Sequence, residues 1–227
     1  MDRLIPLNER ASAASRGAID GSAQRVLRNS FALLGMTLLF SAGIAALAVA
    51  GQWPAPGLLL TLGGYFGLLF AVHKLQRSGW GVVAVFALTG FMGWTLGPLL
   101  SKLIALPGGA QTIALALGAT GAAVLGLSAY ALRSRRDFSA MGGMLMAGMV
   151  VALVAGLAAM FFSIPALSLA VSAMVALLSA GLILFEISRI VHGGEDNYLL
   201  ATVSLFVSIF NLFTSLLSLF GFGSNEE

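Results

Sequence analysis

The amino-acid sequence predicts an all-α integral membrane protein, a bundle of seven transmembrane helices. Three observations support this fold class. The 227 residues are 59% hydrophobic and only 9% charged, whereas a soluble domain is about 25% charged. The apolar residues form continuous runs instead of alternating with polar residues, which argues against a β-barrel. Most of these runs reach the roughly 20 residues that a helix needs to cross a bilayer.

The expected spans follow one another with short connections. The second run is short, and the side chain of Lys74 can extend it by reaching toward the membrane surface. The last run is long enough to cross the bilayer, which favours seven spans over six spans and a re-entrant segment. In order, the runs are Ser30–Ala50, Gly57–Val72, Gly79–Ser101, Ala110–Leu132, Phe138–Phe162, Ile164–Phe185 and Tyr198–Phe222. The predicted bundle therefore covers residues 29–223, between a polar N-terminal tail, 1–28, and a short C-terminal tail, 224–227.

The positive charges predict the orientation of the bundle. Of the 12 Lys and Arg residues, all but Lys102 fall in the N-terminal tail or in the second, fourth and sixth connections. Cytoplasmic loops of membrane proteins carry an excess of Lys and Arg. We therefore predict a cytoplasmic N-terminus and, with seven spans, a C-terminus on the opposite side. The first apolar run is longer than the 7–15 residues of a signal-peptide core, so the tail is not read as a secretory signal.

Small residues recur four positions apart at three places, Gly63/Gly67, Gly93/Gly97 and Ser168/Ser172. Such pairs let helix backbones approach closely, and packing inside the bundle is the expected role of each. Pro98 lies late in the third span. It is expected to kink or end that helix, because proline removes a backbone hydrogen bond and clashes with the preceding turn.

Glu186 is the main candidate for a functional charge, because it is the one acidic residue within the core of a predicted span. A charge inside a membrane is costly and normally marks a pathway or a switch. Arg189 follows three residues later, where it can reach Glu186 along a helix. Two interpretations therefore stay open, a structural ion pair and a proton or cation site.

The last span carries polar residues at steps of four, three, four and three, which places them on one face of a helix. They are Ser204, Ser208, Asn211, Ser215 and Ser218. One interpretation is hydrogen bonding between helices, worth about 0.6 kcal/mol per contact in lipid. The other is that the last helix lies at the centre of the bundle and lines a narrow polar path.

The sequence contains no motif for an enzyme. Cysteine is absent, which excludes disulfides and thiolate chemistry. We find no nucleophile with a neighbouring base, no phosphate-binding loop, no zinc-protease motif and no nucleic-acid signature. The segment His192–Asp196 matches no standard metal-ligand spacing, and its two glycines suit a helix end and a hinge. The prediction is a non-enzymatic protein without cofactor or metal.

Six segments together resemble the Bax-inhibitor transmembrane family. The similarity is greatest to a bacterial inner-membrane branch of this family, and it covers nearly the whole chain from about Val26. The segments are VLRNSF (26–31), PGLLLTLGGYFGLLF (56–70), ALTGFMGWTLGP (87–98), RDFSAMGGMLMAGMVV (136–151), LFEISRIVHGGEDNY (184–198) and ATVSLFVSIFNLFTSLLSLFGF (201–222).

The resemblance implies a seven-helix bundle with the last helix near its centre. It also implies an inner-membrane regulator that binds the membrane AAA protease FtsH and restrains its degradation of membrane proteins, such as subunits of the export channel. In that picture the protease engages the cytoplasmic tail, and the C-terminus is periplasmic. The candidate partner-binding residues are the basic side chains of the tail, Arg3, Arg10, Arg16, Arg25 and Arg28.

Other members of the family are described as pH-sensitive calcium leaks, with a pair of acidic residues on the last two helices. Glu186 falls at the first of these positions, but the second falls at Ser208, which cannot ionise. The chain therefore lacks the paired carboxylates of an acid latch. A cation leak, with calcium or protons as partners, remains the alternative function. Its candidate polar, pH-sensing site comprises Glu186, Arg189, Ser204, Ser208 and Asn211.

Overall fold

The structure is a computed structural model that describes residues 21–134 and 136–223 of the chain. Within these ranges the chain is helical, with no strand, and seven helices are long and apolar enough to cross a membrane. The predicted fold class is confirmed. The elements are α2 (Gly21–Ala50), α3 (Leu58–Leu75), α4 (Trp80–Ile104), α5 (Gly109–Ser134), the short 3-10 helix η1 (Ser139–Met141), α6 (Gly142–Phe161), α7 (Pro165–Val191) and α8 (Tyr198–Gly223).

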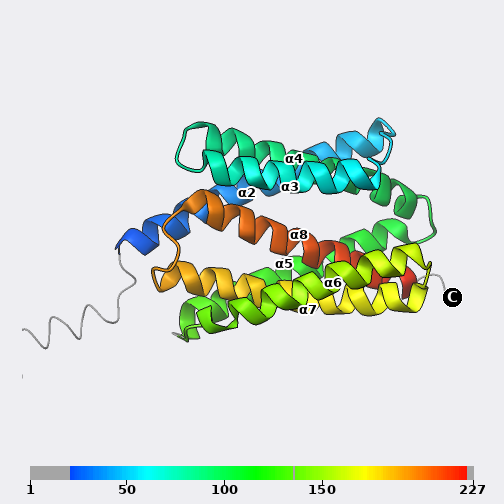
Figure 1. Cartoon of the computed structure of the whole chain (residues 1–227). Coiled ribbons are helices and arrows are strands. Elements are labelled where there is room, and N and C mark those ends of the chain that lie inside the picture. Colours follow the sequence, from blue (N-terminus) through cyan, green and yellow to red (C-terminus); the bar gives the residue numbers. More distant parts are fainter. Residues whose placement is uncertain (1–20, 135, 224–227) are drawn as a thin grey trace, which may run out of the picture.

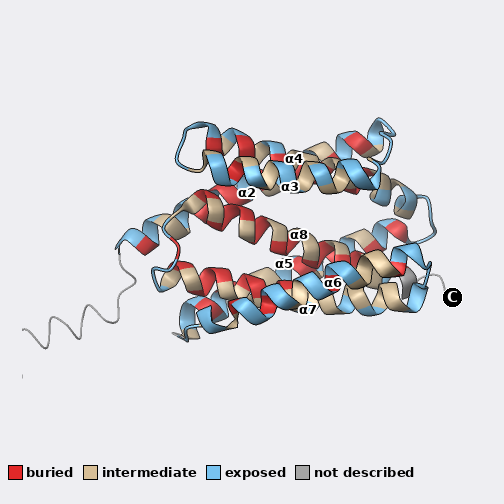
Figure 2. Cartoon of the chain, viewed as in Figure 1, coloured by how far each residue is buried: buried red, intermediate tan, exposed pale blue. Residues whose placement is uncertain are grey.

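Helix α8 lies at the centre of the bundle, as expected. It packs against α2, α3, α4, α5 and α7, and Figure 1 shows it between a group formed by α2, α3 and α4 and a group formed by α5, α6 and α7. In Figure 2 the buried residues concentrate along α8, whereas α3 is largely exposed. Of the 18 residues of α3, Val72 alone is buried. The core therefore surrounds the last helix, and α3 lies at the edge.

Three hydrogen bonds show which helix ends meet. The Thr202 hydroxyl donates to the carbonyl of Ser30 at 3.3 Å, joining the starts of α8 and α2. The Asn197 amide donates to the Gln76 side chain at 3.1 Å, and the Phe138 N–H donates to the Ser188 hydroxyl at 2.9 Å. The start of α2, the ends of α3 and α7 and the η1 segment thus lie at one end of the bundle. We call it the basic end, because it carries Arg25, Arg28, Lys74, Arg77, Arg133, Arg136 and Arg189.

Two helices extend by six residues or more beyond the apolar runs that predicted them. Helix α2 begins at Gly21, so Arg25 and Arg28 lie on its first turns. Helix α7 continues to Val191, six residues past the predicted end at Phe185, and includes Glu186 and Arg189. Polar residues such as Glu, Arg and Gln are good helix formers. The helices therefore extend beyond the hydrocarbon-length segments, which hydropathy alone cannot show.

The small-residue pairs behave differently from one another. A Cβ atom added at Gly93 would lie 2.4 Å from the Ser41 carbonyl oxygen, and one added at Gly97 would lie 2.4 Å from the Ala48 Cβ. This pair therefore packs α4 closely on α2, as predicted. The prediction is wrong for Gly63 and Gly67, which are exposed and have nothing within 4 Å of such an atom.

Pro98 lies inside α4, which continues to Ile104. The expectation that it might end the helix is therefore not met. The neighbouring glycine serves helix packing, and the hydroxyl of Ser101 donates to the Gly97 carbonyl at 2.9 Å. The carbonyl that loses its backbone donor to Pro98 is that of Trp94, four residues earlier.

Candidate functional site

Glu186 lies on α7 close to the basic end and is 6% exposed. Arg189, one turn further along the helix, places Nη1 3.8 Å from Oε1 of Glu186. Its guanidinium also lies over the Phe185 ring, 5.8 Å from the ring centre. The expected ion pair is therefore present, but at the outer limit of an ion-pair distance.

A second carboxylate reaches Arg189 from the other side. After α7 ends, Gly193 adopts a φ of +74°, a left-handed conformation that glycine adopts without strain. The Gly194 N–H donates to the Arg189 carbonyl at 2.8 Å and completes the helix end. This turn brings back Glu195, which is 7% exposed and whose Oε2 accepts a hydrogen bond from Arg189 Nη2. Arg189 thus bridges α7 and the hinge.

The cluster of Glu186, Arg189 and Glu195 has two carboxylates and one guanidinium, so one negative charge is unbalanced. Oε2 of Glu186 is buried and makes no hydrogen bond to the residues that the structure describes. Ser204 of α8 lies close enough to interact with this carboxyl group. A buried charge with an unused oxygen is costly, and such an oxygen is chemically able to take up a proton or a cation.

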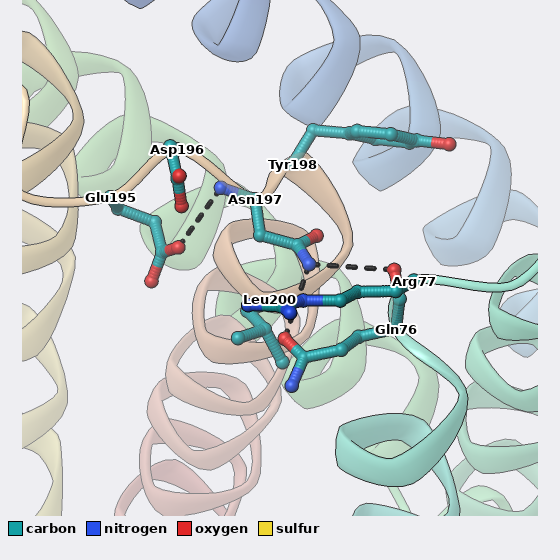
Figure 3. A pocket seen from close by; sticks show the side chains of 7 residues that line it. All are labelled: Gln76, Arg77, Glu195, Asp196, Asn197, Tyr198 and Leu200. Carbon is teal, nitrogen blue, oxygen red and sulfur yellow. Dashed lines mark hydrogen bonds between the residues drawn. The ribbon is translucent and has the colours of Figure 1, made fainter.

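Asn197 connects this cluster to two other helices (Figure 3). Its N–H donates to Oε1 of Glu195 at 3.0 Å, and its Oδ1 accepts the Leu199 N–H at 2.9 Å. The latter bond caps the start of α8. Its Nδ2 donates to Gln76 at the end of α3, to Oε1 at 3.1 Å and to the carbonyl at 3.4 Å. A polar pocket of about 340 Å³ lies at the basic end, and its lining includes Gln76, Arg77, Glu195 and Asn197.

The structure brings only some of the predicted polar residues together. Ser204 lies near Glu186, and Ser208, one turn further along α8, is buried. Asn211 lies elsewhere and lines an apolar cavity between α3 and α6. Ser218 donates to the carbonyl of Thr214 within its own helix. The polar face of α8 therefore divides into separate environments along its length.

Sequence reasoning did not single out Glu195, Asn197 and Gln76 as site residues. Glu195 and Asn197 lie in a stretch that the sequence indicates only as a hinge, and Gln76 is 121 positions away from Asn197 in the chain. The available signal was the glycine pair 193–194, which predicts that the chain turns back after α7. A turn of this kind returns the next residues toward the last turn of the helix.

Arg25 and Arg28 are exposed on the first turns of α2. Arg3, Arg10 and Arg16 lie outside the described residues. Within residues 21–134 and 136–223, no group of three or more His, Asp or Glu side chains could hold a metal ion.

Comparison with known proteins places these features in a family. The sequence model of the family described as inhibitor of apoptosis-promoting Bax1 matches residues 23–225. The chain is 49% identical over 226 residues to a protein of Escherichia coli K12 named "Modulator of FtsH protease YccA", with 100% of both chains covered. An uncharacterized protein of Pseudomonas aeruginosa is 46% identical over 202 residues, covering 89% of this chain and 91% of its own. An uncharacterized membrane protein of Vibrio cholerae is 45% identical over 205 residues, with 89% and 92% covered.

Proposed function

We propose that this chain is a non-enzymatic regulator of the membrane AAA protease FtsH. The premise is that the chain belongs to the family of inhibitors of apoptosis-promoting Bax1. It resides in the bacterial inner membrane, with its N-terminus in the cytoplasm. There it binds the protease and restrains the degradation of membrane proteins, such as export-channel subunits. The observation that carries the proposal is the 49% identity to the E. coli modulator over the full length of both chains.

The contact with the protease is proposed to involve the N-terminal residues. The match to the modulator covers 100% of this chain, whereas the family model begins at residue 23. The alignment with the modulator therefore spans the first 20 residues, which the match to the family model does not include. Arg25 and Arg28, exposed at the start of α2, place two cations directly after this segment. A segment present in the regulator beyond the common fold is a suitable place for a specific partner contact.

The structure indicates where to cut the chain for a test. Deletion of residues 2–20 leaves α2 whole from Gly21, so every helix that the structure describes is kept. The tagged full chain and the truncated chain are produced in cells that lack their own modulator. FtsH that co-purifies is measured, together with the lifetime of an unassembled membrane substrate. A chain with residues 2–20 in scrambled order is the matched control.

We expect the full chain to retain FtsH and to lengthen the substrate lifetime, and the truncated and scrambled chains to lose both effects. Circular dichroism and thermal unfolding of the purified proteins check that the bundle stays folded. If the full chain neither retains FtsH nor changes the lifetime, the regulator function is wrong. If the truncated chain acts as well as the full one, the function stands and the tail contact is wrong.

A second candidate function is a pH-sensitive cation leak, with calcium or protons as the permeant ions. The observation that favours it is the buried Oε2 of Glu186, which lacks a hydrogen-bond partner among the described residues. Purified protein in liposomes is tested for proton-dependent calcium flux. Glu186→Gln should reduce the flux, and Ser208→Asp, which supplies a second acid one turn beyond Ser204, should increase its pH dependence. Equal flux in the wild type and in protein-free liposomes would eliminate this candidate.

A further inference from the structure

Two buried serines on neighbouring helices have hydroxyl groups without a hydrogen-bond partner. They are Ser128 of α5 and Ser179 of α7, which are 8% and 0% exposed. Within residues 21–134 and 136–223, the buried side-chain oxygens without a partner are those of these two serines and Oε2 of Glu186. All three belong to α5 or α7, in the group on one side of α8 (Figure 1). The unpartnered oxygens are therefore confined to one part of the bundle.

Other hydroxyl groups on these two helices bond within their own helix. Thr120 of α5, eight residues before Ser128, donates to the carbonyl four residues earlier at 2.7 Å. Ser172 of α7, seven residues before Ser179, donates to the carbonyl four residues earlier at 2.9 Å. This carbonyl is a usual acceptor for a hydroxyl in a helix. Ser128 and Ser179 leave it unused, so their hydroxyls depend on a partner from outside the helix.

Ser179 lies on the face of α7 that packs against α8. Ile183 and Glu186 follow four and seven residues later, on the same face of the helix. Ile183 belongs to the core cluster that contains Phe206 of α8, and Glu186 lies near Ser204 of α8. Two helix turns, about 10 Å, separate Ser179 from Glu186. Ser179 therefore lies near the middle of α7, deeper in the bundle than Glu186.

Ser128 lies where α5 meets the same core. Helix α5 contacts both α7 and α8. Ala131, one turn after Ser128, belongs to the core cluster that contains Ile187 of α7 and Phe206 of α8. Ser208, two residues after Phe206, is itself buried. Three helices thus each contribute a buried hydroxyl to this part of the core.

We propose that Ser128 and Ser179 bind internal water molecules, which extend the polar surroundings of Glu186 inward along α8. A hydroxyl buried in an apolar interior without a hydrogen bond is costly. Internal water satisfies such groups and needs two to four polar partners. Besides the serine hydroxyls, the partners are the carbonyls of Val124 and Val175, four residues before each serine, because a carbonyl bonded within a helix keeps a second lone pair.

The chemistry of these positions favours water over a cation. A calcium ion takes at least about six oxygen ligands, several of them carboxylates. Within residues 21–134 and 136–223, no three acidic or histidine side chains are grouped to hold a metal ion. Ser128 and Ser179 are neutral and can both donate and accept a hydrogen bond. Water, which also does both, is therefore the ligand that matches them.

The first test is water-edited solid-state NMR of the full chain, labelled at serine and reconstituted in lipid bilayers. The measurement follows the transfer of magnetisation from water to nearby protein groups. The signals of Ser128 and Ser179 are identified by their loss in Ser128→Ala and Ser179→Ala. Ser172 is the matched reference, because it lies on the same face of α7 as Ser179 and its hydroxyl is bonded within the helix.

We expect faster transfer from water to Ser128 and Ser179 than to Ser172. The comparison is stringent, because Ser172 lies nearer to the end of its helix than Ser179 does and so nearer to bulk water. Transfer to Ser128 and Ser179 that is equal to or slower than transfer to Ser172 would overturn the proposal.

The second test is thermal unfolding of the alanine variants, with Ser172→Ala as the control for helix propensity. A hydroxyl bonded only within its helix contributes little to stability. Relative to this control, loss of a water-bonded hydroxyl should lower the unfolding midpoint by about 2–4 °C. Loss of a hydroxyl that has no partner at all should raise it, so a midpoint at or above that of Ser172→Ala would overturn the proposal at that serine. Neither test involves FtsH or ion flux, so a negative result leaves both proposed functions unaffected.

Discussion

Arg189 places Nη1 3.8 Å from Oε1 of Glu186, on the same helix and one turn away. The same guanidinium binds Glu195 of the following hinge. Both carboxylate side chains are buried, whereas that of Arg189 is 32% exposed. Arg189 therefore acts as the common counter-ion of two acids that reach it from different parts of the chain, and its loss leaves both without one.

Replacing Arg189 is expected to destabilise the bundle more than replacing either acid. Removing one partner of a buried ion pair costs about 3–5 kcal/mol, and the partial exposure of Arg189 lowers this to on the order of 2–3 kcal/mol. Glu186→Gln should cost less, because Glu195 keeps its cation. The measurement is the thermal unfolding midpoint in detergent for Arg189→Gln, Glu186→Gln and the double variant. The double variant should recover part of the loss, and equal midpoints for Arg189→Gln and the wild type would contradict the shared counter-ion.

Gly93→Ala is expected to destabilise the α2–α4 interface. The added methyl would lie 2.4 Å from the Ser41 carbonyl oxygen, a backbone atom that cannot rotate away. Overpacking of this kind costs about 1–3 kcal/mol. Gly63→Ala is the control, since its Cβ meets nothing within 4 Å, and alanine in place of glycine favours a helix by up to about 1 kcal/mol. Thermal unfolding should show opposite shifts for the two variants, and shifts of the same sign would contradict the interface.

Asn197→Ala is expected to loosen the start of α8. The substitution removes the cap on the Leu199 N–H and the bonds to Gln76. Loss of a helix cap costs about 0.5–2 kcal/mol. Hydrogen exchange of the first turn of α8 should rise in this variant, while Asp196→Ala, at an exposed neighbour, should leave it unchanged. Asn197→Asp keeps the capping oxygen, so it should recover most of the protection; if it does not, the cap is not the main contribution.

The orientation predicted from the positive charges can be tested directly, because the chain has no native cysteine. Single cysteines are introduced at Ala55, between α2 and α3, and at Ser78, between α3 and α4, both of which are exposed. A membrane-impermeant maleimide is added to cells with a permeabilised outer membrane. Ala55→Cys should be labelled in intact cells, and Ser78→Cys only after the inner membrane is broken. The reverse pattern would show that the basic end faces outward.

The order and number of the helices follow from apolar run length, since only a run of about 20 residues spans the hydrocarbon. The central place of α8 came from the family resemblance and from the polar face that includes Ser208, which is buried. The true ends of α2 and α7 could not be predicted in the same way, because hydropathy ends at the membrane surface whereas helical hydrogen bonding continues. The outward position of Gly63 and Gly67 was also not predictable, because a small-residue pair indicates close approach without naming the partner.

The candidate site was predictable only where its residues are close in the chain. Glu186 and Arg189 are three positions apart, so helix geometry alone indicates their contact. Glu195 reaches Arg189 through the turn at Gly193, and Asn197 reaches Gln76 across 121 positions. Such contacts depend on how α3, α7 and α8 assemble, and local periodicity contains no information about that assembly. Asn211 lines the apolar cavity between α3 and α6, away from Glu186, and its placement there depends on the same assembly.

The central position of α8 also bears on how this protein is made. Membrane helices are inserted in chain order as synthesis proceeds, and α8, Tyr198–Gly223, is the last to emerge. Until it enters the bilayer, the groups formed by α2–α4 and α5–α7 lack the element that both of them pack against. A chain interrupted before residue 198 would therefore present unfilled helix surfaces to the membrane.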